Sequence, residues 1–138
     1  MIDFSTPFGK KLEQRLREEQ VLWLTTVDAQ LTPQPRPIWF HWDGETILIV
    51  SQPRTAKVRH IAANPRVALS FNTDPDGENV GVLIGEAALM REPILPERIA
   101  FYLEKYAEGI VAIKMTPVTL QAEYSQAILV TPLKARGW

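Results

Sequence analysis

Short runs of β-branched and aromatic residues, separated by turn-forming residues, constrain the fold of this chain more than any other feature of its sequence. Runs of this kind predict β-strands. They are VLWLTTV (21–27), PRPIWFHW (35–42), TILIV (46–50), RVALSF (66–71), VGVLIGEAALM (80–90) and SQAILVTPLKA (125–135). Asp43-Gly44 suits a tight hairpin turn, so we expect segment 46–50 to pair antiparallel with segment 35–42.

Helix signals stand at the start of the chain and again between the strands. Segment 5–20 has capping residues and Pro7 at its start, and its apolar residues share one face. These residues are Phe8, Leu12 and Leu16. Segment 55–63 predicts a shorter helix that Asn64-Pro65 stops. The residues expected to be buried on that helix are Val58, Ile61 and Ala62.

The C-terminal half adds further helix before the last strand. Segment 94–113 predicts a helix with Ile99, Leu103 and Tyr106 along one face and a break at Gly109. Residues 115–124 predict a short turn or helix. Tight turns join most of the strands, so the order of elements predicts a closed or nearly closed antiparallel barrel with helices packed on its outside.

Composition limits the classes of function. A chain of 138 residues suits one domain, residues 1–138. A net charge of -1 provides no overall field for nucleic acid or anionic lipid, so neither is an expected partner. The sequence has no cysteine, no signal-peptide pattern and no apolar run long enough for a bilayer. We therefore expect a soluble, cytoplasmic protein.

The segment SQPRTAKVRHIAANPRVALSF (51–71) carries basic or imidazole side chains and no acid. The side chains are Arg54, Lys57, Arg59, His60 and Arg66. A helix N-terminus there would add free N–H groups and a partial positive charge, which together suit a phosphate. Short surface helices are also often basic, so the residues alone leave a solvated helix and an anion cradle equally open.

The block PQPRPIWFHWDGETILIVSQPRTAKVRHIAANPRVALSF (33–71) resembles the pyridoxamine 5'-phosphate oxidase-like flavoproteins. The likeness rests on Arg36, on Ser51 at the end of a strand, and on Lys57 followed eight residues later by Pro65. The strand VLIGEAALM also resembles that family. The stretch FYLEKYAEGIVAIKMTP resembles the subgroup that uses either FMN or the 8-hydroxy-5-deazaflavin coenzyme.

The resemblance implies a mainly β protein with flanking helices, folded as the six-stranded antiparallel split β-barrel that binds FMN. It implies a homodimer with the cofactor, FMN or alternatively the deazaflavin, between the subunits. The implied activity is that of an oxidoreductase moving a hydride to or from a small conjugated or quinone-like molecule. A non-catalytic flavin-binding or storage protein of the same fold is the alternative. A haem-binding relative is disfavoured, because no histidine follows His60.

The resemblance also implies which residues contact the cofactor. Lys57 matches the lysine that contacts the cofactor phosphate, and Ser51 matches the hydroxyl residue near the phosphate and ribityl chain. Arg36 matches the arginine at the start of the flavin-contacting strand. The full set is Arg36, Pro37, Ile38, Trp39, Val50, Ser51, Arg54, Thr55 and Lys57. Trp39, Trp42 or residues of the last strand would complete the site of the partner subunit.

Two departures from the family pattern narrow the activity. An arginine that precedes the lysine in pyridoxamine phosphate oxidases is Ala56 here, and Arg54 would have to substitute from a different position. The C-terminal region rich in arginine and histidine that those oxidases use is also missing, since the only histidines are His41 and His60. Vitamin B6 oxidation is therefore not expected. The sequence predicts no catalytic side-chain set and no metal site, because a cofactor would supply the chemistry.

Overall fold

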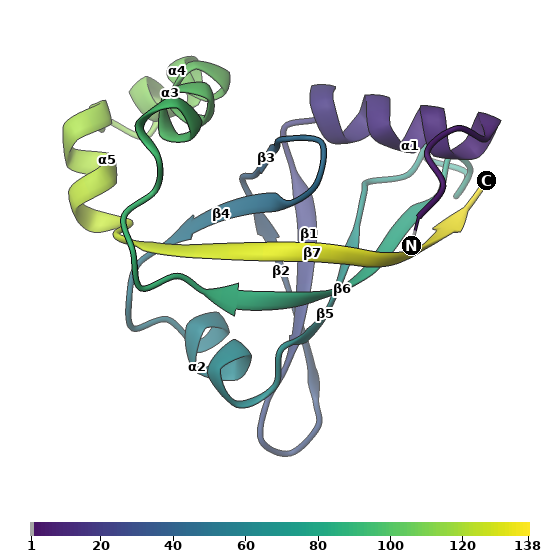
Figure 1. The fold of residues 1–138 in the computed structure, drawn as a ribbon, viewed down its shortest axis with the longest axis horizontal. Coiled ribbons are helices and arrows are strands. Elements are labelled where there is room, and N and C mark those ends of the chain that lie inside the picture. Colours follow the sequence, from purple (N-terminus) through teal and green to yellow (C-terminus); the bar gives the residue numbers. More distant parts are fainter. Residues whose placement is uncertain (1) are drawn as a thin grey trace.

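Seven strands form one antiparallel sheet that curls into an open barrel in the computed structural model, which describes residues 2–138 (Figure 1). The strands are β1 (Leu22–Val27), β2 (Pro33–Ile38), β3 (His41–Trp42), β4 (Ile47–Ser51), β5 (Arg66–Ser70), β6 (Gly81–Leu89) and β7 (Gln126–Gly137). They are ordered β2-β1-β5-β6-β7-β4-β3 across the sheet. The predicted split-barrel fold with outer helices is confirmed, with seven strands in place of six.

The seventh strand arises because segment 35–42 is broken in two. β2 begins at Pro33 and pairs with β1, so that Arg36 lies opposite Leu24. Of the two pieces, β3 alone pairs with β4, and it does so over two residues. The main neighbour of β4 is β7. The expected long hairpin between segments 35–42 and 46–50 is therefore wrong, although its turn is present. At the break, the Phe40 N–H donates to the Tyr106 hydroxyl at 2.8 Å, so it takes no part in a strand ladder.

The first two helices lie where the sequence predicts them. Helix α1 (Pro7–Glu18) begins after Thr6, whose hydroxyl accepts from the Gly9 N–H at 2.9 Å, and it buries Leu12 and Leu16. Helix α2 (Ala56–Ala63) begins after Thr55 and buries Val58 and Ile61. Ala62 is exposed, contrary to expectation, because this short helix lies against the sheet along a narrow stripe only.

Three short helices form a C-terminal lobe at one end of β7, away from α1 (Figure 1). They are α3 (Pro96–Lys105), α4 (Ala107–Ala112) and α5 (Pro117–Glu123), and α5 confirms the helical choice for residues 115–124. The expected break at Gly109 is wrong, since the interruption falls at Tyr106 and Gly109 lies inside α4. A side chain at Gly109 would meet the Trp39 ring, with its Cβ 3.0 Å from two ring carbons.

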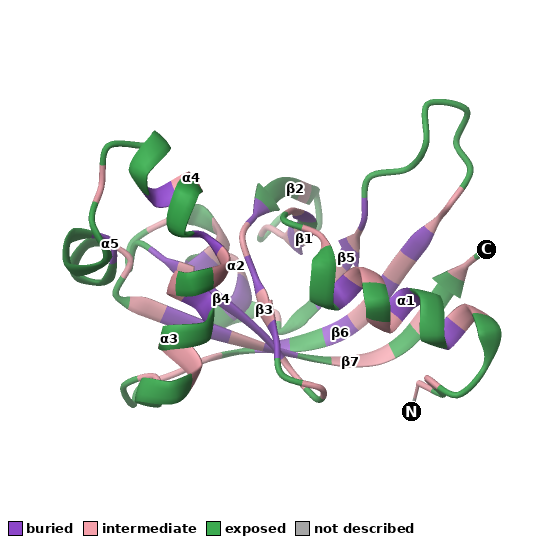
Figure 2. Ribbon diagram, turned by 90° about the horizontal axis from the view of Figure 1, so that it is seen from above, coloured by how far each residue is buried: buried purple, intermediate pink, exposed green. Residues whose placement is uncertain are grey.

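The apolar core is divided into two clusters. The larger fills the barrel and includes Leu16, Phe40, Trp42 and Leu69. The smaller joins the lobe to β4 and β7 through Leu48, Tyr102, Tyr106, Ile110, Leu120 and Ala127. Helices α3 to α5 are exposed over most of their remaining surface (Figure 2). Among residues 2–138, none of the helices has the length and apolarity that a transmembrane segment needs.

Candidate functional site

A cavity of about 350 Å³ opens between the C-terminal lobe and the barrel, and we call it the lobe cleft. It is lined by Val21, Pro37, Ile38, Trp39, Val50, Lys57, Tyr102, Ile113, Leu120 and Tyr124. Pockets of this size bind small organic molecules and cofactors, and they typically combine apolar walls with a few polar groups. Of the residues predicted from the sequence, Pro37, Ile38, Trp39, Val50 and Lys57 meet here.

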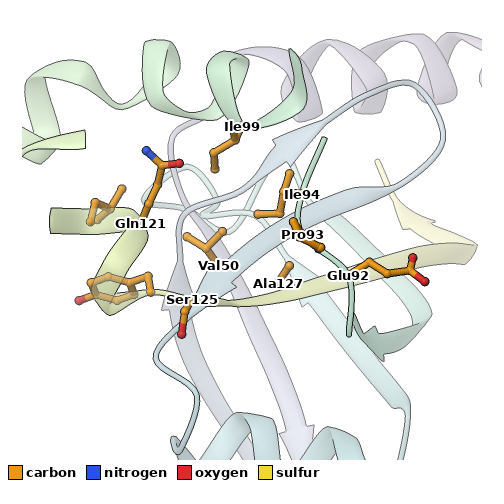
Figure 3. A pocket seen from close by; sticks show the side chains of 10 residues that line it. Val50, Glu92, Pro93, Ile94, Ile99, Gln121, Ser125 and Ala127 are labelled. Atoms are coloured by element: carbon orange, nitrogen blue, oxygen red, sulfur yellow. The ribbon is translucent and has the colours of Figure 1, made fainter. Parts of the chain in front are cut away.

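A second cavity of about 220 Å³ adjoins the lobe cleft and shares Val50, Leu120 and Tyr124 with it. Figure 3 shows its side chains, with Ile94, Ile99 and Val50 gathered between α3 and β4. The polar residues Glu92, Gln121 and Ser125 stand around this apolar centre. The two cavities therefore lie next to each other along the junction of lobe and sheet.

Lys57 is the cation of the lobe cleft. It lies in the first turn of α2, half-buried, and residues 2–138 offer it no carboxylate at ion-pair distance. Burial lowers the pKa of the Lys57 ammonium, and the positive charge of nearby Arg36 lowers it further. Lys57 and Arg36 repel each other, and no acid of residues 2–138 lies between them to relieve the repulsion. An anion bound near them would therefore be stabilised.

The hydroxyl residues of the β4–α2 connection shape the loop and do not line the cleft. Ser51 is fully buried, and its hydroxyl donates to the Gln52 carbonyl at 2.8 Å. The Ser51 and Thr55 hydroxyls also share a hydrogen bond of 3.0 Å. The Thr55 side chain makes no capping hydrogen bond, so it does not accept from the backbone N–H groups that begin α2.

The two arginines of the predicted set differ in position. Arg36 is exposed on β2 and donates from Nη1 to the Pro35 carbonyl at 2.9 Å. It lies close enough to Lys57 to lower the pKa of the Lys57 ammonium. Arg54 is exposed and lies outside both cavities, and its carbonyl accepts a hydrogen bond of 2.8 Å from Arg59. The proposed substitution of Arg54 for the family arginine, whose position Ala56 occupies here, stays a prediction.

Trp39 and Trp42 are held by their own chain. The Trp39 ring stacks on Tyr106, with centroids 4.5 Å apart and an interplanar angle of 2°, and it closes one side of the lobe cleft. Trp42 is 4% exposed and donates its indole N–H to Glu13 at 3.2 Å. The expectation that Trp42 could reach the site of a partner subunit is therefore wrong.

The lobe residues of the cleft are those that sequence reasoning missed. Tyr102, Ile113, Leu120 and Tyr124 come from α3, α5 and the segments beside them. The spacing of Tyr102 and Tyr106 along one helix face was the available signal, because residues four apart share a face. It did not reveal that this face packs on β4.

The two histidines lie apart. His60 Nδ1 shares a hydrogen bond of 2.8 Å with the Thr26 hydroxyl, and the His41 ring stacks on Phe101. Within residues 2–138, no group of three or more histidine and carboxylate side chains could hold a metal ion.

Comparison with known proteins points to one family. The family model for pyridoxamine 5'-phosphate oxidase matches residues 8–138. A solved F420 reductase is 30% identical, with 90% of this chain and 94% of that chain covered and a TM-score of 0.65. A Listeria innocua protein described as a candidate pyridoxamine 5'-phosphate oxidase is 23% identical, with 92% and 91% covered and a TM-score of 0.64. A search of the curated proteins found no match.

The same fold also occurs in a protein whose description names heme. HutZ, a heme storage protein from Vibrio cholerae, is 16% identical, with 96% of this chain and 95% of that chain covered and a TM-score of 0.71. At this identity the likeness concerns the fold alone, because one fold hosts many unrelated functions.

Proposed function

Because the chain belongs to the pyridoxamine 5'-phosphate oxidase-like family of split-barrel proteins, we propose that it is an oxidoreductase that binds FMN or the 8-hydroxy-5-deazaflavin coenzyme in the lobe cleft. Its substrate is a small conjugated or quinone-like molecule. The observation that carries the proposal is Lys57, a half-buried cation without an acid partner in residues 2–138, on the wall of an apolar cavity.

The chemistry of the cleft fits a ring cofactor that ends in a phosphate. Lys57, with Arg36 nearby, provides positive charge where α2 begins, and charged hydrogen bonds to phosphate are strong. The helix start contributes N–H groups of its own. Pro37, Ile38 and Val50 give apolar surface against which a ring can pack.

A bound flavin or deazaflavin supplies the hydride chemistry, and the residues of this chain bind it, orient it and exclude water. Trp39 limits the cleft from the barrel side, and its stack on Tyr106 and its closeness to Gly109 of the lobe hold the indole in one place. Ser51 and Thr55 act indirectly in this proposal. Their shared hydrogen bond fixes the loop that brings Lys57 to the cavity.

The deazaflavin is supported by the likeness to the F420 reductase at 30% identity, since F420 is a deazaflavin coenzyme. FMN remains the first candidate because its single phosphate matches the single lysine of the cleft. Each cofactor would bind through the same Lys57, so the affinities measured in parallel titrations decide between them.

The proposal includes a homodimer with the cofactor at the subunit interface. Ile113, a residue of the cleft wall, is still 47% exposed, and Arg36 on β2 is exposed as well. A second subunit would cover such a surface. Sedimentation analysis with and without FMN is expected to give twice the mass of the chain, and a monomer in both conditions would contradict this part of the proposal.

The decisive experiment separates the phosphate from the ring. Lys57→Ala is expected to weaken FMN binding by about 1–3 kcal/mol, the worth of a charged hydrogen bond. Riboflavin, which lacks the phosphate, should bind both proteins equally. Arg59→Ala is the matched control, because it removes an exposed cation from the same helix and lies outside the cleft.

The outcomes have distinct meanings. Equal losses for FMN and riboflavin would show that Lys57 does not contact the phosphate. Binding of neither cofactor to the wild-type protein would leave only the family and the fold. A bound ring that is never reduced by a nicotinamide or deazaflavin donor would identify a flavin-binding protein that is not an enzyme.

A further inference from the structure

One tyrosine of the lobe cleft has a hydroxyl that the rest of residues 2–138 leaves free of hydrogen bonds. Tyr102 on α3 is 2% exposed and lines the cleft, and its ring packs against Tyr106 with centroids 5.0 Å apart. Its hydroxyl makes no hydrogen bond with any of residues 2–138. The Tyr106 hydroxyl, by contrast, lies within 2.9 Å of the N–H and C=O groups of Phe40 and the carbonyl of Gln20.

Most hydroxyl groups of largely buried residues are hydrogen-bonded to protein or to water. The Tyr102 hydroxyl is not among the fully buried atoms without a partner, so solvent or a ligand in the cleft can reach it. Burial, together with the nearby Tyr106 and Tyr124, raises the pKa of Tyr102. The phenol thus stays protonated at neutral pH and can act as a hydrogen-bond donor.

The surroundings of this hydroxyl define what it can bind. The cleft offers apolar contact from Ile38, Val50 and Leu120, which suits a planar ring. Lys57 is the cation of the cleft and suits an anion, whereas a neutral phenol suits a neutral acceptor oxygen. A carbonyl group on a ring is the acceptor that both the apolar walls and the neutral donor accommodate.

We infer that the Tyr102 hydroxyl donates a hydrogen bond to a carbonyl oxygen of a planar ring seated in the lobe cleft. The inference rests on the proposed function and deepens it. The carbonyl belongs either to the ring of the cofactor or to a quinone-like substrate. In both cases Tyr102 is a residue that determines specificity.

Calorimetric titration of wild-type protein and Tyr102→Phe tests the inference without measuring turnover. The ligands are FMN, then menadione added to the FMN-saturated protein, and 2-methylnaphthalene, which has the shape of menadione without its carbonyl groups. Tyr102→Phe is expected to weaken binding of FMN or of menadione by roughly 2- to 12-fold and to leave 2-methylnaphthalene unchanged. The ligand that is affected identifies the source of the carbonyl.

Tyr124→Phe is the matched control, because Tyr124 lines the same cleft but is only half-buried. The same loss in Tyr124→Phe and not in Tyr102→Phe would overturn the assignment. Unchanged affinities for FMN and menadione in Tyr102→Phe, or an equal loss for 2-methylnaphthalene, would also overturn it. A marked fall in the unfolding temperature of Tyr102→Phe would overturn it as well, since the hydroxyl would then serve the fold.

Failure of the inference is distinguishable from failure of the proposed function. If Lys57→Ala weakens FMN binding but Tyr102→Phe changes the affinity for neither FMN nor menadione, the inference fails and the proposed function stands. If the wild-type protein binds no FMN or deazaflavin, the proposed function fails. Menadione and 2-methylnaphthalene then decide the inference on the cofactor-free protein, and absence of menadione binding there overturns it too.

Discussion

Two tyrosines four residues apart show how one side chain serves the fold and another faces the cleft. Tyr106 ends α3, and its hydroxyl accepts the Phe40 N–H at 2.8 Å in the buried interior where β2 ends. Tyr102 has the same chemistry, but its hydroxyl has no partner in residues 2–138. The effect on stability of removing each hydroxyl should therefore differ in size.

Tyr106→Phe is expected to lower the free energy of unfolding by about 1–3 kcal/mol, because it leaves the buried Phe40 N–H without an acceptor. Tyr102→Phe should leave it unchanged. Urea denaturation of both variants and the wild-type protein measures the difference. Equal stability of the two variants would contradict the structural role of Tyr106.

Lys105 gives a pH-dependent prediction at the same scale. Its ammonium donates to the Phe40 carbonyl at 2.9 Å and lies 3.7 Å from the centre of the Phe40 ring. Burial lowers the pKa of Lys105 to about 8 from its ordinary value of 10.5. Between those values the unfolded chain binds more protons than the folded protein, so the free energy of unfolding should rise with pH.

Urea denaturation at pH 7.5 and pH 9 measures this rise, and about nine-tenths of unfolded tyrosines are still protonated at pH 9. Lys105→Met should reduce it but not abolish it, because the pKa of Lys57 is lowered as well. A rise of the same size in Lys105→Met and in the wild-type protein would show that Lys105 is not its source.

At the scale of elements, β2 is an edge strand protected by its composition. Pro33, Pro35 and Pro37 face Val27, Thr25 and Trp23 across the pair with β1. Because proline has no N–H, the ladder to β1 uses the residues between the prolines, and the free edge presents carbonyl groups without donors. An edge of this kind cannot readily add another strand.

Pro35→Val is expected to place an N–H on this edge and to increase self-association, measured by light scattering against concentration. Gln34→Val is the matched control, because it adds the same side chain at a position whose N–H already faces β1. Equal scattering by the two variants would indicate that the side chain and not the edge causes the association.

The elements also show what the sequence could and could not predict. The limits of α2 followed from Thr55 and Asn64-Pro65, because caps and stops act locally. The break at Trp39 and Phe40 did not, since it depends on Tyr106, which lies 66 residues beyond Phe40. No edge strand was predicted from the three alternating prolines, and only the register shows that β2 pairs with β1 and not with β4.

At the scale of the whole molecule, the lobe cleft lies between two bodies with separate apolar clusters. The family resemblance implied most of its barrel side, namely Pro37 to Trp39 with Val50 and Lys57, whereas Val21 was missed. It did not predict the lobe side, which requires knowing where three short helices pack on β4 and β7.

Binding of FMN is therefore expected to slow amide hydrogen exchange in α3, α4 and α5 as well as in α2, because a ligand between two bodies stabilises their contact. Hydrogen exchange followed by mass spectrometry, with and without FMN, measures the effect. Slowing confined to α2 would indicate a ligand held at the phosphate end only.

The division of the cleft between sheet and lobe has a consequence for how such a protein can change over evolutionary time. Helices α3, α4 and α5 take no part in the strand ladder, so substitutions there can reshape one wall without disturbing any strand register. Lys57 and the bend at Trp39 belong to the other wall. Substitutions in the lobe can accordingly change the shape of the cleft and leave Lys57 and the sheet wall unaltered.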